Sequence, residues 1–205
     1  HDGHLSSEGG TTLAIAGCAG RGLIKNSVLE GADATVLSLL SDGSLLAFKG
    51  GNTLTANGGT ALQIFHSTGA LDGAELAVTF EGTPTSHPIH IENGGSVTLG
   101  EVNLMPDGST LAAISLVGAE ASFGRLQVIH PEGVAIQAAD AILSIGEGAI
   151  VSTGAPALSL TGVKGEMNFA KLGSLDSATQ GLLLRDFDGK LTIRQLAIAG
   201  AAQGP

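Results

Sequence analysis

The sequence predicts an all-β fold: a right-handed parallel β-helix, or solenoid, of about eight coils with three short strands in each. Three observations support this prediction. A short apolar run returns at a nearly constant interval along the whole chain, apolar and polar residues alternate within each repeat, and glycine is dense, with 32 in 205 residues. Regular repeats of this kind are typical of stacked architectures, in which each unit covers the apolar face of its neighbour.

The first strand of each coil is predicted from the recurring run. The run reads TLAI, VLSL, ALQI, PIHI, AISL, AIQA, ALSL and LLLR, and it begins at Thr12, Val36, Ala61, Pro88, Ala113, Ala135, Ala157 and Leu182. The interval between starts is longest from ALQI to PIHI and shortest on either side of AIQA. Since alternate residues of a strand point to opposite faces, we expect Ile89 and Ile91 of PIHI to point inward and His90 outward.

The second and third strands are predicted from a longer pattern that follows several of these runs. In LDGAELAV, VTLGEVNL, ASFGRLQV and LTIRQLAI, two alternating pairs are separated by two further residues. This two-residue step breaks the alternation and indicates a corner between two strands. A glycine that can adopt a positive φ then closes the coil, and the candidates are Gly82, Gly108, Gly133, Gly154 and Gly200.

The composition suits a narrow core made of similar layers. Hydrophobic residues make up 43% of the chain, Trp and Tyr are absent, and Phe occurs six times. The single cysteine, Cys18, is predicted to be a small buried filler. A net charge of −10 argues against nucleic-acid binding, which depends on Lys and Arg at phosphates. We expect residues 1–205 to form one β-helix segment, a fragment of a longer chain.

The sequence contains no pattern that predicts catalysis or metal binding. Neither a nucleophile elbow nor a phosphate-binding loop is present. His87 and His90 are three positions apart, and in a strand such residues point to opposite faces, which makes a shared metal awkward. His66 and His130 are expected to be exposed residues at turns. We therefore predict no catalytic residue, no bound metal and no cofactor.

Two units of the chain resemble a known family. STLAAISLVGAEASFGRLQVIHPEG and GVAIQAADAILSIGEGAIVSTG resemble the passenger domains of Gram-negative autotransporters, especially the pertactin-like ones, and the resemblance covers nearly the whole chain. It implies a rod at the cell surface or secreted, an adhesin or virulence factor that binds a host protein or cell-surface ligand. It also implies a C-terminal β-barrel translocator in the full-length protein. A weaker resemblance, through FKGGNTLTANGGTALQI, is to chlamydial polymorphic outer-membrane proteins.

Partner-binding residues are predicted where the coils are longest, because insertions in a solenoid form loops at its corners. Residues 82–87 and the polar run 49–59 are the two segments, with the candidates Lys49, Asn52, Asn57, Thr83, Thr85 and His87. Two alternatives remain open. The chain is a structural stalk of a larger passenger, or it is a carbohydrate-active β-helix enzyme, which requires clustered acidic residues and a groove on one outer face.

Overall fold

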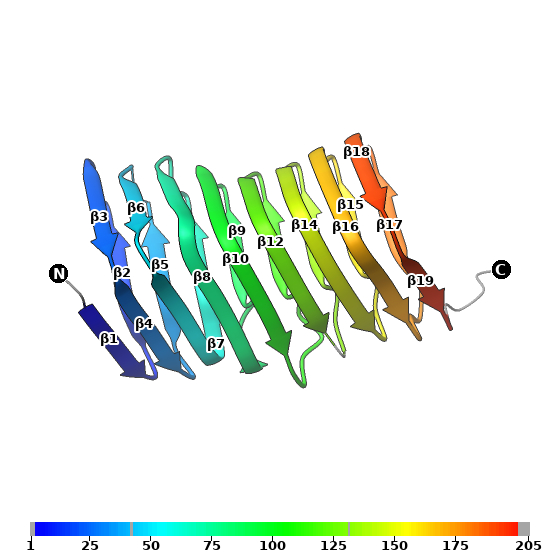
Figure 1. Cartoon of the computed structure of the whole chain (residues 1–205), viewed down its shortest axis with the longest axis horizontal. Coiled ribbons are helices and arrows are strands. Elements are labelled where there is room, and N and C mark those ends of the chain that lie inside the picture. The colour runs from blue at the N-terminus through cyan, green and yellow to red at the C-terminus, as the bar shows by residue number, and fades with distance from the viewer. Residues whose placement is uncertain (1–2, 42, 131, 201–205) are drawn as a thin grey trace.

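The computed structural model describes residues 3–41, 43–130 and 132–200, and these form a rod of stacked parallel β-strands without a helix. Figure 1 shows the strands side by side along the rod, with β1 at one end and β19 at the other. Each coil of the chain pairs in parallel with the coils before and after it. The predicted β-solenoid is confirmed.

Side I of the rod contains the recurring run of the repeat. Eight strand segments pair here in parallel: β2 (Thr11–Ala16), β5 (Thr35–Leu40), the second half of β7 (Asn52–Phe65), β9 (Ile89–Glu92), β11 (Ile114–Val117), β13 (Ile136–Ala139), β15 (Leu158–Thr161) and β17 (Leu182–Arg185). Ile89 and Ile91 are fully buried, whereas His90 faces outward and is partly exposed, as predicted.

Sides II and III form the broad face seen in Figure 1. Side II contains β3 (Arg21–Lys25), β6 (Leu45–Lys49), the first halves of β8 (Ala70–Pro84), β10 (Ser96–Pro106), β12 (Glu120–His130), β14 (Ile142–Thr153) and β16 (Lys164–Leu175), and β18 (Asp188–Ile193). Side III contains the second halves of the same long strands together with β1 (Gly3–Glu8), β4 (Ser27–Ala32), the first half of β7 and β19 (Leu196–Ala199).

The prediction of three separate strands per coil is wrong for the coils with long strands. From β8 to β16, sides II and III form one strand, because the parallel ladder continues across the bend between them. The predicted break in alternation is nevertheless present. In β10, Leu99 and Val102 are both buried, while Gly100 and Glu101 between them both face outward.

One predicted repeat start is wrong by a single residue. Leu182 pairs with Leu158, so the counterpart of Ala157 in the next coil is Gly181, one position before the predicted start. The other starts are confirmed by the register, for example Leu62 with Ile89 and Ile89 with Ile114. LLLR resembles ALSL in its letters, but it is the inward side chains that must stack, and these are Leu158 and Leu182.

The core is a set of ladders of inward side chains that run along the rod. Four phenylalanines are among the largest fully buried side chains: Phe48, Phe80, Phe123 and Phe169. Neighbouring coils adjust to this bulk. Gly148 pairs with Phe169, and a Cβ added to Gly148 would lie 2.4 Å from a ring carbon of Phe169. Because protein interiors are close-packed, the ring of Phe169 occupies the space that a side chain at position 148 in the neighbouring coil would fill.

The corner between sides I and II repeats one backbone conformation in all eight coils. The φ angle there lies between 45° and 63° at Gly17, Ser41, His66, Asn93, Gly118, Asp140, Gly162 and Asp186. The glycines predicted to close the coils lie elsewhere: Gly82, Gly108, Gly154 and Gly200 have a positive φ, as predicted, and Gly133 does not. At the corner between sides I and II, five of the eight residues are not glycine. Asn, Asp and His tolerate the left-handed region better than other side chains, which explains four of the five.

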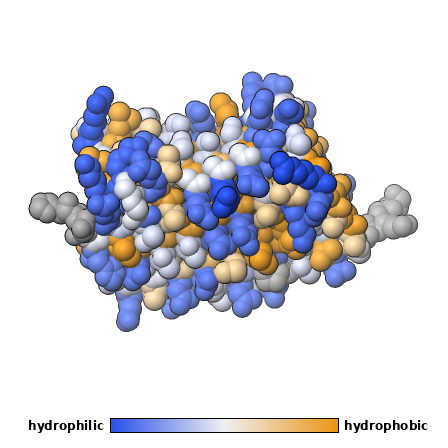
Figure 2. Space-filling model, in the orientation of Figure 1, coloured by the Kyte–Doolittle hydropathy of each residue, from blue (hydrophilic) through white to orange (hydrophobic). Residues whose placement is uncertain are grey.

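The two ends of the rod expose apolar residues, because the first and last coils have a neighbour on one side only. Leu5 and Leu23 at one end and Leu196 and Ile198 at the other are 44–57% exposed. Figure 2 shows hydrophobic residues near both ends and mainly hydrophilic or neutral residues over the central coils. The central coils are therefore the part of this face suited to polar recognition.

Candidate functional site

Lys49 and Asn52, two predicted partner-binding residues, flank the bend between sides II and III. Lys49 ends β6, and its Nζ lies 3.1 Å from Asp72 Oδ2 and 3.5 Å from Glu75 Oε1. The hydrogen bond and charge of Asp72 raise the pKa of Lys49, and the same hydrogen bond lowers the pKa of Asp72. The positive charge of Lys49 is thus already balanced by carboxylates of the next coil.

Asn52 is a buried structural residue and is only 2% exposed. Its Oδ1 accepts a hydrogen bond from the Ser27 amide at 2.9 Å, and its Nδ2 donates to the carbonyl oxygens of Lys49 and Gly50. The expected polar loop over residues 49–59 is wrong from Asn52 to Asn57, which form the first half of β7. The Asn52 side chain therefore ties the Ser27 amide of the preceding coil to the carbonyls at the bend near Gly50.

The other candidates lie at the far corner of the rod, between sides III and I. Asn57, Thr83 and Thr85 are exposed or partly exposed, and His87 is partly buried. The expected loop over residues 82–87 is wrong for its first half, because β8 continues to Pro84. The six candidates therefore lie at two corners, and the structure does not bring them together into one site.

The histidines differ from the prediction in two places. His130 is 1% exposed rather than a surface residue, and its Nε2–H donates to the Leu111 carbonyl at 2.6 Å. His87 lies before strand β9 rather than within it, so its ring reaches the ring of His90, with centroids 4.9 Å apart. His87 Nδ1–H donates to the Ala112 carbonyl at 2.9 Å. His66 is exposed at a turn, as predicted.

Cys18 is exposed rather than buried. It follows Gly17, where the chain turns from side I to side II in the first coil. The prediction is wrong because residue type favours burial, whereas the position of Cys18 at a corner of an end coil places it outside the core.

A groove of about 770 Å³ runs along the bend between sides II and III over the central coils. Its floor is made of residues without side chains, or nearly so, at the bend itself: Ala74, Gly100 and Gly124. A Cβ on Gly100 would lie 2.2 Å from the Ala74 carbonyl oxygen, and one on Gly124 2.7 Å from that of Gly100. Close stacking of the coils thus requires glycine, and the absence of side chains there hollows the surface.

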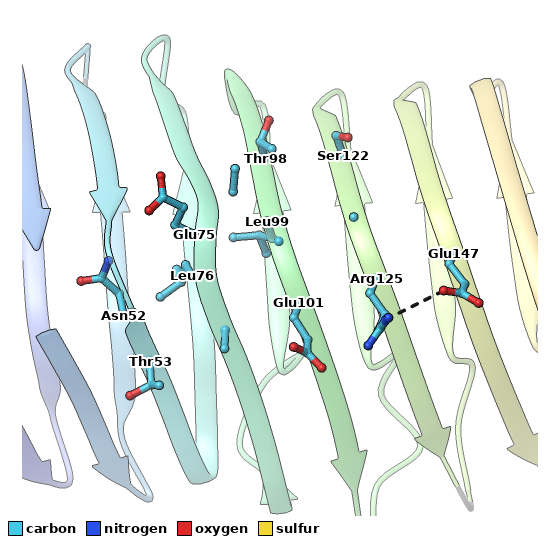
Figure 3. Close-up of a pocket in the computed structure, with 15 residues that line it drawn as sticks. Asn52, Thr53, Glu75, Leu76, Thr98, Leu99, Glu101, Ser122, Arg125 and Glu147 are labelled. Carbon is cyan, nitrogen blue, oxygen red and sulfur yellow. Dashed lines mark ion pairs between the residues drawn. The ribbon is translucent and has the colours of Figure 1, made fainter. Parts of the chain in front are cut away.

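Polar side chains line both walls of this groove (Figure 3). Thr98 and Ser122 are paired neighbours on side II. On side III, Glu101, Arg125 and Glu147 come from the successive strands β10, β12 and β14 and form one row across them. In the coils of β10 and β12 the groove therefore has a hydroxyl on one wall and a charged group on the other.

The charged row is open to solvent. Arg125 Nε lies 3.9 Å from Glu147 Oε2, and the two side chains are 67% and 56% exposed. Among the described residues, no cation lies within ion-pair distance of Glu101. A pair so exposed contributes little to folding stability, typically below about 1 kcal/mol, and these residues are free to contact a ligand.

Sequence reasoning missed this groove, although a signal for it was present. The two-residue step in the alternation reads Gly100-Glu101, Gly124-Arg125 and Gly146-Glu147 in three successive coils. Read within a single repeat, this step indicates a corner only. A glycine followed by a charged residue at the same place in each coil also predicts a groove with a charged wall.

Two features are absent from the part of the chain that the structure describes. Within residues 3–41, 43–130 and 132–200, no three His, Cys, Asp or Glu side chains are grouped so that they could hold a metal ion. The same residues include no helix long and apolar enough to cross a membrane.

Comparisons with known proteins found no matching protein family, no similar curated protein and no similar solved structure.

Proposed function

We propose that this chain is a non-enzymatic rod, displayed on the surface of a Gram-negative bacterium or secreted by it, which binds a host protein or cell-surface ligand. The groove over the central coils is the observation that supports this most. It crosses five coils, from Asn52 in β7 to Glu147 in β14, and its charged side chains are largely exposed. A shallow surface that is open to water suits the binding of a large ligand better than it suits catalysis, because catalysis benefits from the exclusion of water.

The resemblance to autotransporter passengers supports the proposed location and role. The stacked coils, the glycine-rich corners and the acidic net charge of −10 all fit a rod that presents side chains outward along its length. An adhesin of this kind uses surface contacts spread over several coils. Exposure on the bacterium is tested by protease treatment of intact cells that express the full-length gene product, with detection by an antibody against this segment.

Binding is tested with purified protein of residues 1–205. We expect saturable binding to cultured host cells, or to at least one host extracellular or serum protein, which unlabelled protein competes away. Heat-denatured protein is the control for adhesion through exposed apolar residues. If the folded protein binds no cell type and no protein above the denatured control, the proposal is wrong for this segment.

A carbohydrate-active enzyme is the second candidate, because the acidic residues it requires are present. Glu75, Glu101 and Glu147 line the same groove, and glycoside hydrolysis commonly uses a pair of carboxylates. Incubation with a panel of polysaccharides and measurement of new reducing ends separates the candidates. Product formation that Glu101→Gln or Glu147→Gln abolishes would favour the enzyme over the binding rod.

A further inference from the structure

We propose that the groove between sides II and III binds a neutral linear glycan, which lies parallel to the rod axis with successive sugars on successive coils. This inference rests on the proposed binding function and names the class of ligand. It follows from three properties of the groove: the order of its charges, the hydrogen-bonding groups on its walls, and the distance between its repeats.

The order of charges favours a neutral ligand. The row on side III is acidic, basic and acidic again, at Glu101, Arg125 and Glu147. An anionic polymer would meet two carboxylates. A polycation would meet the guanidinium of Arg125 at the centre of the row, between the two acids, and would compete with the rod's own ion pair to Glu147. At the far end, Lys49 is paired with both Asp72 and Glu75, so that end adds no uncompensated positive charge.

The walls offer both donors and acceptors in neighbouring coils. Carboxylates accept hydrogen bonds, a guanidinium donates them, and the hydroxyls of Thr98 and Ser122 do either. Sugar hydroxyls also donate and accept, so they match such a mixed row. An extended peptide matches it less well, because it binds a sheet through unpaired main-chain groups at an edge. Strands β10 and β12 are paired on both sides.

The repeat of the groove fits a linear sugar chain. Neighbouring β-strands lie about 4.8 Å apart, and an extended chain of linked hexoses advances by a similar distance per sugar. Glycines 100 and 124 leave the floor between the walls free of side chains, so a flat sugar ring can approach the backbone. The coils of β10 and β12 thus each present one wall hydroxyl, one bare floor position and one charged group to a sugar.

The experiment measures binding of residues 1–205 to glycan and peptide probes by isothermal titration calorimetry. The probes are neutral linear oligosaccharides of several linkages, uronate-containing and sulfated oligosaccharides of similar length, and an oligolysine peptide. We expect at least one neutral oligosaccharide to bind and the charged probes to bind about tenfold more weakly or not at all.

Three variants and two controls locate the site. Glu101→Gln and Arg125→Gln remove charged hydrogen-bonding groups, and Ser122→Tyr fills the groove from an outward position. Each is expected to weaken binding of the neutral glycan by about tenfold. Glu120→Gln, on the same strand β12 but outside the groove, and Arg21→Gln, at the end of the rod, should stay within about twofold. Circular dichroism spectra of all five variants are compared with that of the unsubstituted protein to check that each variant keeps the fold.

Three outcomes would overturn the inference: no neutral glycan binds, oligolysine alone binds, or the groove variants bind the glycan as well as the controls do. The variants are also tested for binding to host cells and proteins. If the groove variants keep that binding, the glycan inference fails while the proposed function stands. If the unsubstituted protein binds neither glycans nor host material, both fail.

Discussion

At the scale of single residues, burial decides how two histidines behave. His130 ends β12 with its side chain inside the rod, and its Nδ1 has no hydrogen-bond partner among the described atoms. Burial lowers the pKa of His130, although its hydrogen bond to Leu111 and the charge of Glu132 act in the opposite direction. Burial and the neighbouring His87 likewise lower the pKa of His90, against the effect of Glu92.

These shifts predict that the protein loses stability in mild acid. A histidine whose pKa is lower in the folded state than in the unfolded state contributes stability that is present above its unfolded pKa, about 6.5. That stability is lost as pH falls through the lowered folded value, because the unfolded chain binds the proton first. We expect the free energy of unfolding in urea to fall from pH 7 to pH 5.

The variant His130→Gln should show a shallower fall over this range, since glutamine can still donate to the Leu111 carbonyl but does not titrate. His66→Asn, at an exposed turn, serves as the control and should keep the slope of the unsubstituted protein. Equal slopes for His130→Gln and the unsubstituted protein would show that burial of this histidine does not cause the acid sensitivity.

At the scale of the element, one type of turn controls the rod. Where side I ends, the amide of each left-handed residue from Gly17 to Gly162 donates to a carbonyl of the following coil, as from Ser41 to Phe65 at 2.9 Å. The turn therefore both redirects the chain and joins adjacent coils. Because its conformation is the same in each coil, its cost depends only on which residue occupies it.

Substitution at this turn should change stability according to residue type. Ser41→Gly removes a strained side chain and should raise the free energy of unfolding by up to about 1 kcal/mol. Gly118→Ala introduces a Cβ at a φ of 56° and should lower it by about 1–2 kcal/mol. Gly51→Ala is the matched control, because its φ is not positive and a Cβ there meets no atom within 4 Å. Urea denaturation measures all three, and similar effects of the two alanine substitutions would contradict this account.

At the scale of the whole molecule, the coil is the unit of construction. Among the described residues, the strands of each coil pair only with those of the coil before it and the coil after it, so stability is approximately a sum of contributions from single repeats and their interfaces. Ile114 and Ile136 are paired and occupy the same position in successive coils. Removing residues 114–135 therefore joins Ala113 directly to Ile136. In the next coil, Ile136 occupies the position that Ile114 occupies after Ala113.

We expect this deletion to give a folded rod that is shorter by one coil. Leu99 would then stack on Ile145 and Leu104 on Ile150, so the inward ladders stay apolar, and the free energy of unfolding should fall by about 1–3 kcal/mol. Circular dichroism and a single cooperative urea transition measure this. Deletion of residues 114–124 removes only part of a coil and should prevent folding, because the remaining strands lose register. Equal behaviour of the two deletions would contradict a rod built from whole coils.

The sequence by itself determined the fold class, the number of coils and nearly every register. These follow from period and alternation, because inward side chains must stack at a fixed interval, and only the last start was displaced by one residue. Tertiary structure decided what depends on neighbours in adjacent coils. The burial of Asn52 and His130, the contact between His87 and His90, and the exposure of Cys18 each depend on a coil's position in the stack or on the residue beside it. The groove is the clearest case: Gly100 and Gly124 are far apart in sequence, and only stacking places them together between a polar and a charged wall.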